Sequence, residues 1–110
     1  MQITFKSKKL ENILTDPREI SKTYGVMAKK VNQRIKELSA APSLVVMKTL
    51  PAANCHELHG GRAGELAVDI SGNWRIIFEP DHDPVPAKAD GGLDWNSVTQ
   101  IKILKVTDYH

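Results

Sequence analysis

The chain has 110 residues, of which 41% are apolar, and a formal net charge of +2 at pH 7. This length predicts a single domain over residues 1–110, and no apolar stretch approaches the roughly 20 residues that a membrane span requires. The single cysteine, Cys55, cannot form an internal disulfide, which fits a reducing compartment, so we expect a soluble cytoplasmic protein without membrane contact.

The small net charge hides an uneven distribution. Residues 1–50 carry 10 Lys+Arg and 4 Asp+Glu, whereas residues 51–110 carry 5 and 9. A basic half of this kind can neutralise phosphates or bind an acidic partner. A solvated helix surface has the same pattern, and the charge distribution alone does not separate these interpretations.

The first half of the chain predicts a strand and two helices. Ile3 to Phe5 alternate as in a short strand, and Lys8 to Leu14 have the spacing of a short helix. A longer helix is predicted from Asp16 to Leu38, because Asp16 can cap it and Pro17 suits its first position. Its apolar stripe consists of Ile20, Tyr24, Met27, Val31, Ile35 and Leu38.

The second half predicts three antiparallel strands. Leu66–Ser71 and Trp74–Glu79 alternate with a period of two, and Gly72-Asn73 between them suits a hairpin turn. Arg75 should therefore point to the face opposite Trp74. The last strand, Val98–Tyr109, has apolar residues on both faces, which indicates a central position or a bulge.

A long loop over about residues 80–96 separates the last two strands. The segment "PDHDPVPAKADGGLDWNS" contains three prolines, two adjacent glycines and four aspartates. Such a composition excludes regular structure over most of its length, and loops this long are usually functional or mobile. The order of elements predicts an α+β fold, with an N-terminal strand and two helices packed on a small antiparallel sheet that ends in a C-terminal β-meander.

The segment "HELHGGRAGELAVDISGNWRIIFEP" and the ending "DYH" resemble the HigB branch of the RelE/ParE toxin superfamily. The resemblance covers Cys55–Pro80 and Ile101–His110, and it implies a RelE-like fold. Members of this family are toxins of toxin–antitoxin pairs that enter the ribosomal A site and cut messenger RNA without a metal. Their partner is a helix-turn-helix antitoxin, HigA, through which the complex can contact DNA indirectly.

This chain departs from the family pattern at two places. His59 stands where a lysine is common in relatives, which replaces a permanent charge by one that titrates near neutrality. The loop at 80–96 exceeds the tight connection of compact members, and some sequences with such a loop are described as killer suppressors.

Metal-independent RNA cleavage needs a base, an acid and cations that stabilise the phosphorane. The resemblance implies one group of catalytic residues and a second group that binds the RNA phosphate. Arginine suits the second group, because its guanidinium fork matches the phosphate oxygens. We also expect the basic helix to contact ribosomal RNA. The catalytic candidates are His56, Asp108, Tyr109 and His110, the RNA- and phosphate-binding candidates are His59, Arg62 and Arg75, and the ribosome-contacting candidates are Lys22, Lys29, Lys30, Arg34 and Lys36.

Each candidate also has an ordinary structural interpretation. His56 can cap a loop turn, and Tyr109 can cover the core. Arg75 can pair with Glu65 or Asp69 across the hairpin. The residues alone leave these alternatives open.

A metal site is not expected. Cys55 and His56 are adjacent and would not readily converge on one ion, and "HELH" lacks the spacing of the zinc motif HExxH. Cys55 is expected to be a small buried residue. The glycines of this segment are expected to let the backbone turn into the following strand. We therefore expect no cofactor.

The leading hypothesis is the toxin of a type II toxin–antitoxin pair that acts as a ribosome-dependent endoribonuclease, or mRNA interferase. Its partners would be a HigA-like antitoxin, the ribosome and messenger RNA. Two alternatives remain open: a ParE-like toxin that inhibits DNA gyrase, and a non-catalytic module that binds a partner through the acidic loop.

Overall fold

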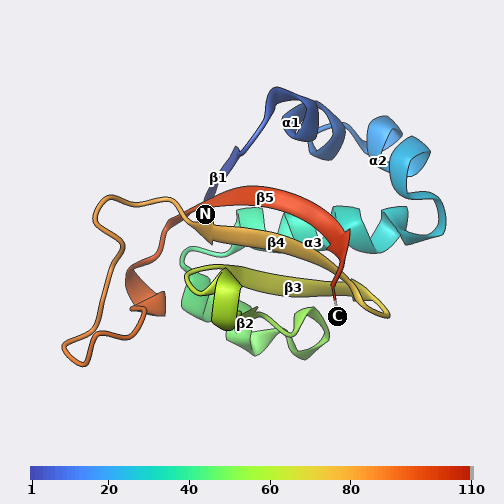
Figure 1. Cartoon of the computed structure of the whole chain (residues 1–110). Helices are drawn as coiled ribbons and strands as arrows, with labels where there is room; N and C mark the ends of the chain where they lie inside the picture. Colours follow the sequence, from blue (N-terminus) through green and yellow to red (C-terminus); the bar gives the residue numbers. More distant parts are fainter. Residues whose placement is uncertain (110) are drawn as a thin grey trace.

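The computed structural model describes residues 1–109, and the candidate catalytic residue His110 lies outside the described residues. The α-helices are α1 (Lys8–Leu14), α2 (Pro17–Tyr24) and α3 (Ala28–Ala40), and the strands are β1 (Gln2–Phe5), β2 (His56–Glu57), β3 (Leu66–Ser71), β4 (Trp74–Pro80) and β5 (Gln100–Asp108). The strands form one sheet in the order β1-β5-β4-β3-β2, and α3 runs behind it (Figure 1). This arrangement confirms the predicted α+β class.

The sheet is mixed, which corrects the expectation of an antiparallel sheet. β3, β4 and β5 form the predicted antiparallel meander around the Gly72-Asn73 turn. β1, however, pairs in parallel with β5, with Ile3 opposite Ile101 and Phe5 opposite Ile103. Parallel strands need a long crossover connection, and the helices and the meander between β1 and β5 provide it.

The predicted helix from Asp16 to Leu38 is two helices. Asp16 caps α2 as expected, since its side chain accepts a hydrogen bond from Arg18 N at 2.9 Å. Gly25 then adopts φ 55° and ψ −121°, outside the helical region, and a 3₁₀ turn over Gly25–Met27 leads into α3. The apolar stripe continues through this break, because α2 and α3 both pack toward the core.

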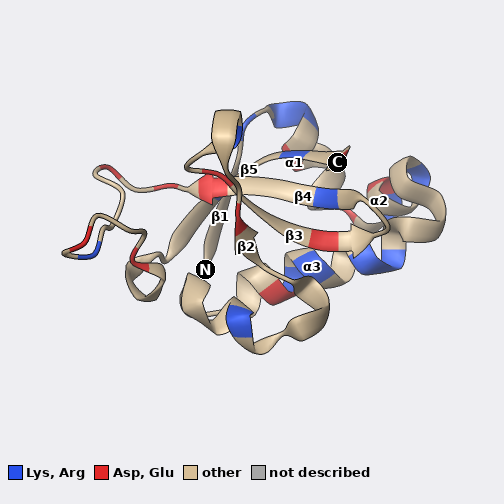
Figure 2. Cartoon of the chain, turned by 60° about the horizontal axis from the view of Figure 1, so that its bottom comes forward, with Lys and Arg blue, Asp and Glu red and all other residues tan. Residues whose placement is uncertain are grey.

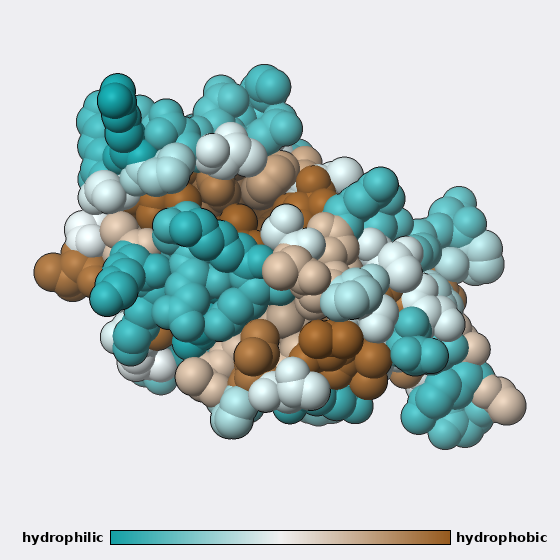
Figure 3. Space-filling model, turned by 180° about the vertical axis from the view of Figure 1, so that it is seen from behind, coloured by the Kyte–Doolittle hydropathy of each residue, from teal (hydrophilic) through white to brown (hydrophobic). Residues whose placement is uncertain are grey.

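The main core lies between the helices and the sheet. Phe78, Ile76 and Val68 point from the sheet toward α3, whose Val31 and Leu38 are fully buried. The helix-covered side also has an apolar groove of about 700 Å³ beside β1, and Figure 3 shows apolar surface between the hydrophilic side chains on this side. The groove is lined by Met1, Ile3, Phe5, Leu14, Ile20 and Ile35, among others.

A second, smaller apolar cluster lies on the opposite, helix-free face of the sheet. It contains the buried residues Leu58, Ala67 and Ile77, with Leu104 and Tyr109 packed against them. β5 lies inside the sheet, between β1 and β4. It also has a bulge, because Ile77 pairs with Lys105 but the next residue, Phe78, pairs with Ile103, so that one residue of β5 is left over. Both interpretations of the last strand are therefore confirmed. We call this helix-free side the open face.

The loop after β4 is irregular over most of its length, as predicted, and it projects from the end of the sheet (Figure 1). Its tip is closed by a bridge between Ala87 and Leu93. Its base is anchored by Trp95, which is only 9% exposed and donates a hydrogen bond from Nε1 to Glu57 Oε2 at 3.0 Å. The Lys48 ammonium lies 4.4 Å from the centre of the Trp95 ring. Within residues 1–109, no helix is both long and apolar enough to cross a membrane.

Candidate functional site

The strand register aligns polar side chains in rows across the open face. His56 of β2 pairs with Ala67, which pairs with Ile77, which in turn pairs with Lys105. Residues opposite each other on neighbouring strands point to the same face. His56 and Lys105 therefore lie at the two ends of one row, with the small apolar cluster between them.

Asp69, Arg75 and Thr107 form the next row. The structure thus places Arg75 on the face opposite Trp74 and Ile76, as the alternation predicted. Arg75 Nε lies 2.8 Å from Asp69 Oδ1, and its Nη1 donates to the carbonyl of Gly72 at 2.7 Å. Of the two carboxylates considered for Arg75 from the sequence, Asp69 is the partner.

His56 has a defined orientation. Its Nδ1 lies 2.7 Å from the main-chain carbonyl oxygen of Asn54. A carbonyl only accepts hydrogen bonds, so Nδ1 carries the hydrogen in the neutral imidazole and Nε2 keeps its lone pair. The side chain is half-buried, and its Nε2 is therefore suited to accept a proton from a bound hydroxyl.

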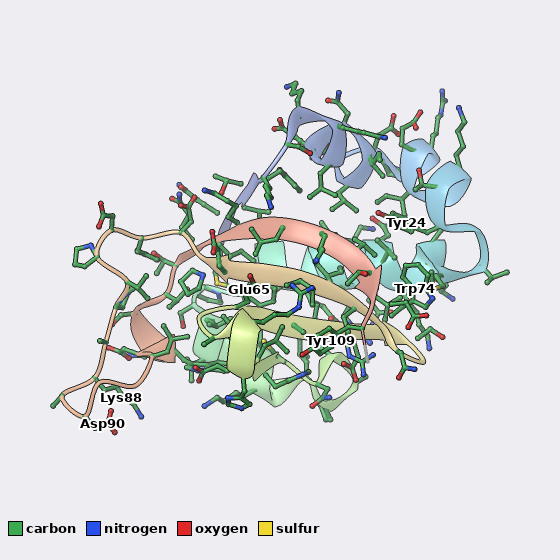
Figure 4. All side chains as sticks on the ribbon, viewed as in Figure 1. Tyr24, Glu65, Trp74, Lys88, Asp90 and Tyr109 are labelled. Carbon is green, nitrogen blue, oxygen red and sulfur yellow. The ribbon has the colours of Figure 1, made fainter. Side chains whose placement is uncertain are left out.

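Arg62 and Tyr109 meet on the same face. The Arg62 guanidinium lies 5.4 Å from the centre of the Tyr109 ring, and its Nη1 is 3.1 Å from Glu65 Oε1. Tyr109 is held at the end of β5 by a hydrogen bond from its main-chain N–H to the carbonyl of Asn73 at 2.8 Å. Figure 4 looks onto this face, with Tyr109 and Glu65 labelled over the strands.

Two other sequence candidates lie outside this arrangement. Asp108 pairs with Trp74, so its register places it on the side opposite Arg75 and Thr107. His59 is exposed at the start of the 3₁₀ turn Gly60–Arg62. Positive φ angles at Gly60 (65°) and Gly64 (93°) agree with the turn role expected for these glycines.

Four of the five ribosome-contacting candidates are exposed on α2 and α3: Lys22, Lys29, Lys30 and Lys36. Figure 2 shows Lys and Arg, in blue, on both of these helices.

Arg34 corrects the expectation of a fifth exposed cation on this surface, because it is only 4% exposed. Its Nε donates to the carbonyl of Asp69 at 2.7 Å and its Nη2 to the carbonyl of Ala52 at 3.0 Å. Its Nη1 pairs with Glu37 Oε1 at 3.1 Å. The guanidinium thus joins α3 to β3 and to the segment that precedes His56, beneath the open face.

The structure also shows residues that the sequence interpretation missed. Asn54 precedes β2 with φ 45° and donates from Nδ2 to Asp69 Oδ2 at 3.1 Å. An asparagine before two histidines carries no distinctive local signal, because its role depends on a strand 15 residues later. Lys105 was missed because the β5 bulge shifts the alternation that would have placed it.

Cys55 is partly buried and packs against the main core, so the prediction of a buried residue is only partly met. Burial raises the pKa of its thiol to about 12, against a smaller opposing effect of Lys48. A thiol of this kind is a poor metal ligand near neutral pH, because the thiolate is the binding form. Among residues 1–109, no three His, Cys, Asp or Glu side chains are grouped so that they could hold a metal ion.

The open face therefore combines a histidine with a defined tautomer, two arginines and a tyrosine around a small apolar floor. Such a face can take up a proton and stabilise an anion. Both arginines are already paired with carboxylates, so an anionic ligand would have to compete with Glu65 and Asp69.

Comparison with known proteins bears on the fold. The elements define an α+β protein with helices on one face of a mixed sheet and a helix-free opposite face. Among solved structures, the chain is similar to a "YoeB/ParE toxin from Agrobacterium tumefaciens", with a TM-score of 0.56, 13% sequence identity and 100% of each chain covered. No protein-family model and no curated protein sequence matches the chain. The similarity therefore establishes a shared fold and does not distinguish the HigB branch from others.

Proposed function

We propose that the chain is a single toxin domain of a type II toxin–antitoxin pair and acts as a ribosome-dependent, metal-independent endoribonuclease on messenger RNA. The observation that supports this most is the open face, where His56 with an available Nε2 shares one surface with Arg62, Arg75 and Tyr109. The solved structure with the same fold is described as a toxin, which agrees with the proposal.

In the proposed reaction, His56 Nε2 takes the proton from a 2′-hydroxyl, and the 2′-oxygen attacks the adjacent phosphorus. The bond from phosphorus to the 5′-oxygen then breaks, and an acid at the end of β5 protonates the leaving oxygen. Tyr109 is the described residue there that lies on the open face, and His110 is the other candidate. Asp108, the remaining residue of the predicted group, could serve only if its side chain reached around the end of the strand from the opposite side. Arg75 and Arg62 stabilise the charge on the phosphorane, and His59 contacts the RNA from the neighbouring loop.

The partners follow from the other surfaces. We propose that Lys22, Lys29, Lys30 and Lys36 contact ribosomal RNA, since clustered exposed cations attract phosphates. A HigA-like helix-turn-helix antitoxin would cover the apolar groove beside β1 and would provide the indirect DNA contact. Such a toxin would act in the cytoplasm.

One observation favours a second candidate. Because Asp69 and Glu65 pair with the two arginines of the open face, an RNA phosphate would have to displace these carboxylates. A ParE-like toxin that inhibits DNA gyrase needs no phosphate site. A non-catalytic module that binds through the acidic loop is a further alternative.

The test is induced expression of the wild type, His56→Ala and Arg75→Ala, with growth and messenger RNA ends followed together. Asn96→Ala, an exposed position in the loop segment, is the matched control and should behave as the wild type. Growth arrest with new RNA ends that disappear in both site variants supports the nuclease. Arrest without new ends that persists in His56→Ala would refute the nuclease and direct attention to gyrase, which a supercoiling assay reads directly.

A further inference from the structure

Asn54 links two parts of the open face that are far apart in the sequence. It lies between the 3₁₀ turn Pro51–Ala53 and β2, in the left-handed conformation with φ 45° and ψ 53°. Within residues 1–109, it is the one non-glycine residue with positive φ. Asparagine tolerates this conformation better than most residues, but its two contacts indicate a role beyond the turn.

The main chain of Asn54 orients the histidine. Its carbonyl oxygen accepts the Nδ1 hydrogen of His56 at 2.7 Å. The left-handed conformation aims this carbonyl at a side chain only two residues later. The position of the Asn54 backbone therefore determines which imidazole nitrogen keeps its lone pair.

The side chain of Asn54 reaches the arginine through Asp69. Its Nδ2 donates to Asp69 Oδ2 at 3.1 Å, and the other carboxylate oxygen lies 2.8 Å from Arg75 Nε. Asp69 Oδ1 is buried and accepts no hydrogen bond of good geometry from the described residues. Its contact with Arg75 is therefore an ion pair in which no N–H points at the oxygen. The bond from Asn54 is therefore the directional contact that orients the Asp69 carboxylate.

We propose that Asn54 is a positioning residue that sets the His56 tautomer and, through Asp69, the place of the Arg75 guanidinium. Its catalytic meaning rests on the proposed nuclease function, in which His56 is the base and Arg75 stabilises the phosphorane. One residue thus holds the base and the cation in fixed positions relative to each other, although they lie on different strands, β2 and β4. A displacement of about 1 Å at such a site can cost on the order of 100-fold in rate.

Two substitutions separate the side chain from the backbone. Asn54→Gly keeps the left-handed conformation at little cost and removes only the amide that holds Asp69. Asn54→Asp keeps the shape of the side chain but sets a carboxylate against the Asp69 carboxylate, which repels it. Asn96→Gly is the matched control, because it makes the same asparagine-to-glycine change at an exposed position in another 3₁₀ turn, Trp95–Ser97.

The first readout does not depend on activity. Nitrogen-15 spectra of the folded full-length chain report which imidazole nitrogen of His56 carries the hydrogen. We expect the Nδ1–H form in the wild type, in Asn96→Gly and in Asn54→Gly, because the carbonyl at position 54 stays in place. A third variant, Asn54→Val, should show a mixture of both tautomers, because a β-branched residue disfavours the left-handed conformation that aims this carbonyl. The Arg75 Nε resonance should move in Asn54→Gly and Asn54→Asp but not in Asn96→Gly. Either an unchanged His56 tautomer in Asn54→Val or an unchanged Arg75 Nε resonance in Asn54→Gly would overturn the proposal.

The second readout is single-turnover messenger RNA cleavage on purified ribosomes. We expect Asn54→Gly to lower the rate constant by about 10- to 100-fold, with little change in the ribosome concentration that gives half the maximal rate. A shift in that concentration alone would contradict a positioning role. If the wild type and His56→Ala were equally inactive, the proposed nuclease would fail. If His56→Ala lost activity while Asn54→Gly kept it, only the inference about Asn54 would fail.

Discussion

Replacement of Arg34 by methionine tests the buried link beneath the open face. Arg34 donates to two main-chain carbonyls and to Glu37, at 2.7, 3.0 and 3.1 Å, and it is 4% exposed. Methionine keeps the apolar stem of the side chain but leaves the carbonyls of Ala52 and Asp69 without this donor. The substitution therefore isolates the polar contribution.

The expected loss follows from these contacts. A hydrogen bond to a charged group contributes about 1.5–3 kcal/mol, and a buried polar group left unpaired costs about 1–3 kcal/mol. The Glu37 side chain is 20% exposed, so solvent screens its ion pair with Arg34 and we count only part of that contribution. We expect Arg34→Met to lower the free energy of unfolding by about 3–5 kcal/mol, a large fraction of the 5–15 kcal/mol typical of a domain.

The assay is equilibrium unfolding in urea followed by circular dichroism, supported by thermal unfolding, where a fall in Tm of about 12–20 °C is expected. Arg34→Lys should recover only part of the loss, because an ammonium cannot span three acceptors as a guanidinium fork does. The control is Lys36→Met on the exposed side of α3, with a change within about 0.5 kcal/mol. A loss below about 1 kcal/mol in Arg34→Met would refute the assignment of Arg34 as a structural link.

Three further outcomes are expected. Hydrogen bonds from Thr4 and Gln100 lower the pKa of Asp81. The contribution of Asp81 to stability is therefore complete above about pH 4 and is lost as the pH falls through the lowered pKa. Urea unfolding should show a difference in unfolding free energy between the wild type and Asp81→Asn that is constant near neutral pH and disappears in acid. Because burial raises the pKa of Cys55 to about 12, its thiol should react with a chromogenic disulfide at pH 8 much more slowly in the native protein than in urea, and equal rates would contradict the burial. Trp95→Phe removes the indole N–H that holds the base of the loop. Limited trypsin digestion should then cleave after the loop lysine, Lys88, several-fold faster than in the wild type. An unchanged cleavage rate would contradict the role of this hydrogen bond as an anchor.

Local patterns in the sequence predicted much of the fold. The bounds of α1, the start of α2 at Asp16 and the hairpin turn at Gly72-Asn73 agree with the structure. These features depend on neighbouring residues, since a cap, a turn and an alternating strand are each defined within a few positions. The position of Arg75 on the face opposite Trp74 followed from the same two-residue period.

Features that depend on distant partners were missed or only partly predicted. The break at Gly25 lay inside an apolar stripe that continues across it, so the helical spacing did not reveal it. The resemblance indicated His56 and Arg75, but it said nothing about Asn54. Arg34 was grouped with the surface lysines, because its place on a helix shows its charge and not its neighbours.

The sequence by itself determined the class of fold, the meander and the residue types from which a site can be made. Only the tertiary structure decided that β1 pairs with β5, that Arg34 lies inside, and that Asn54 joins His56 to Asp69. The physical reason is the range of the interactions. Backbone preferences and periodicity act over a few residues, whereas burial and hydrogen bonding of a polar group depend on which distant carbonyls and carboxylates the packed chain brings to it.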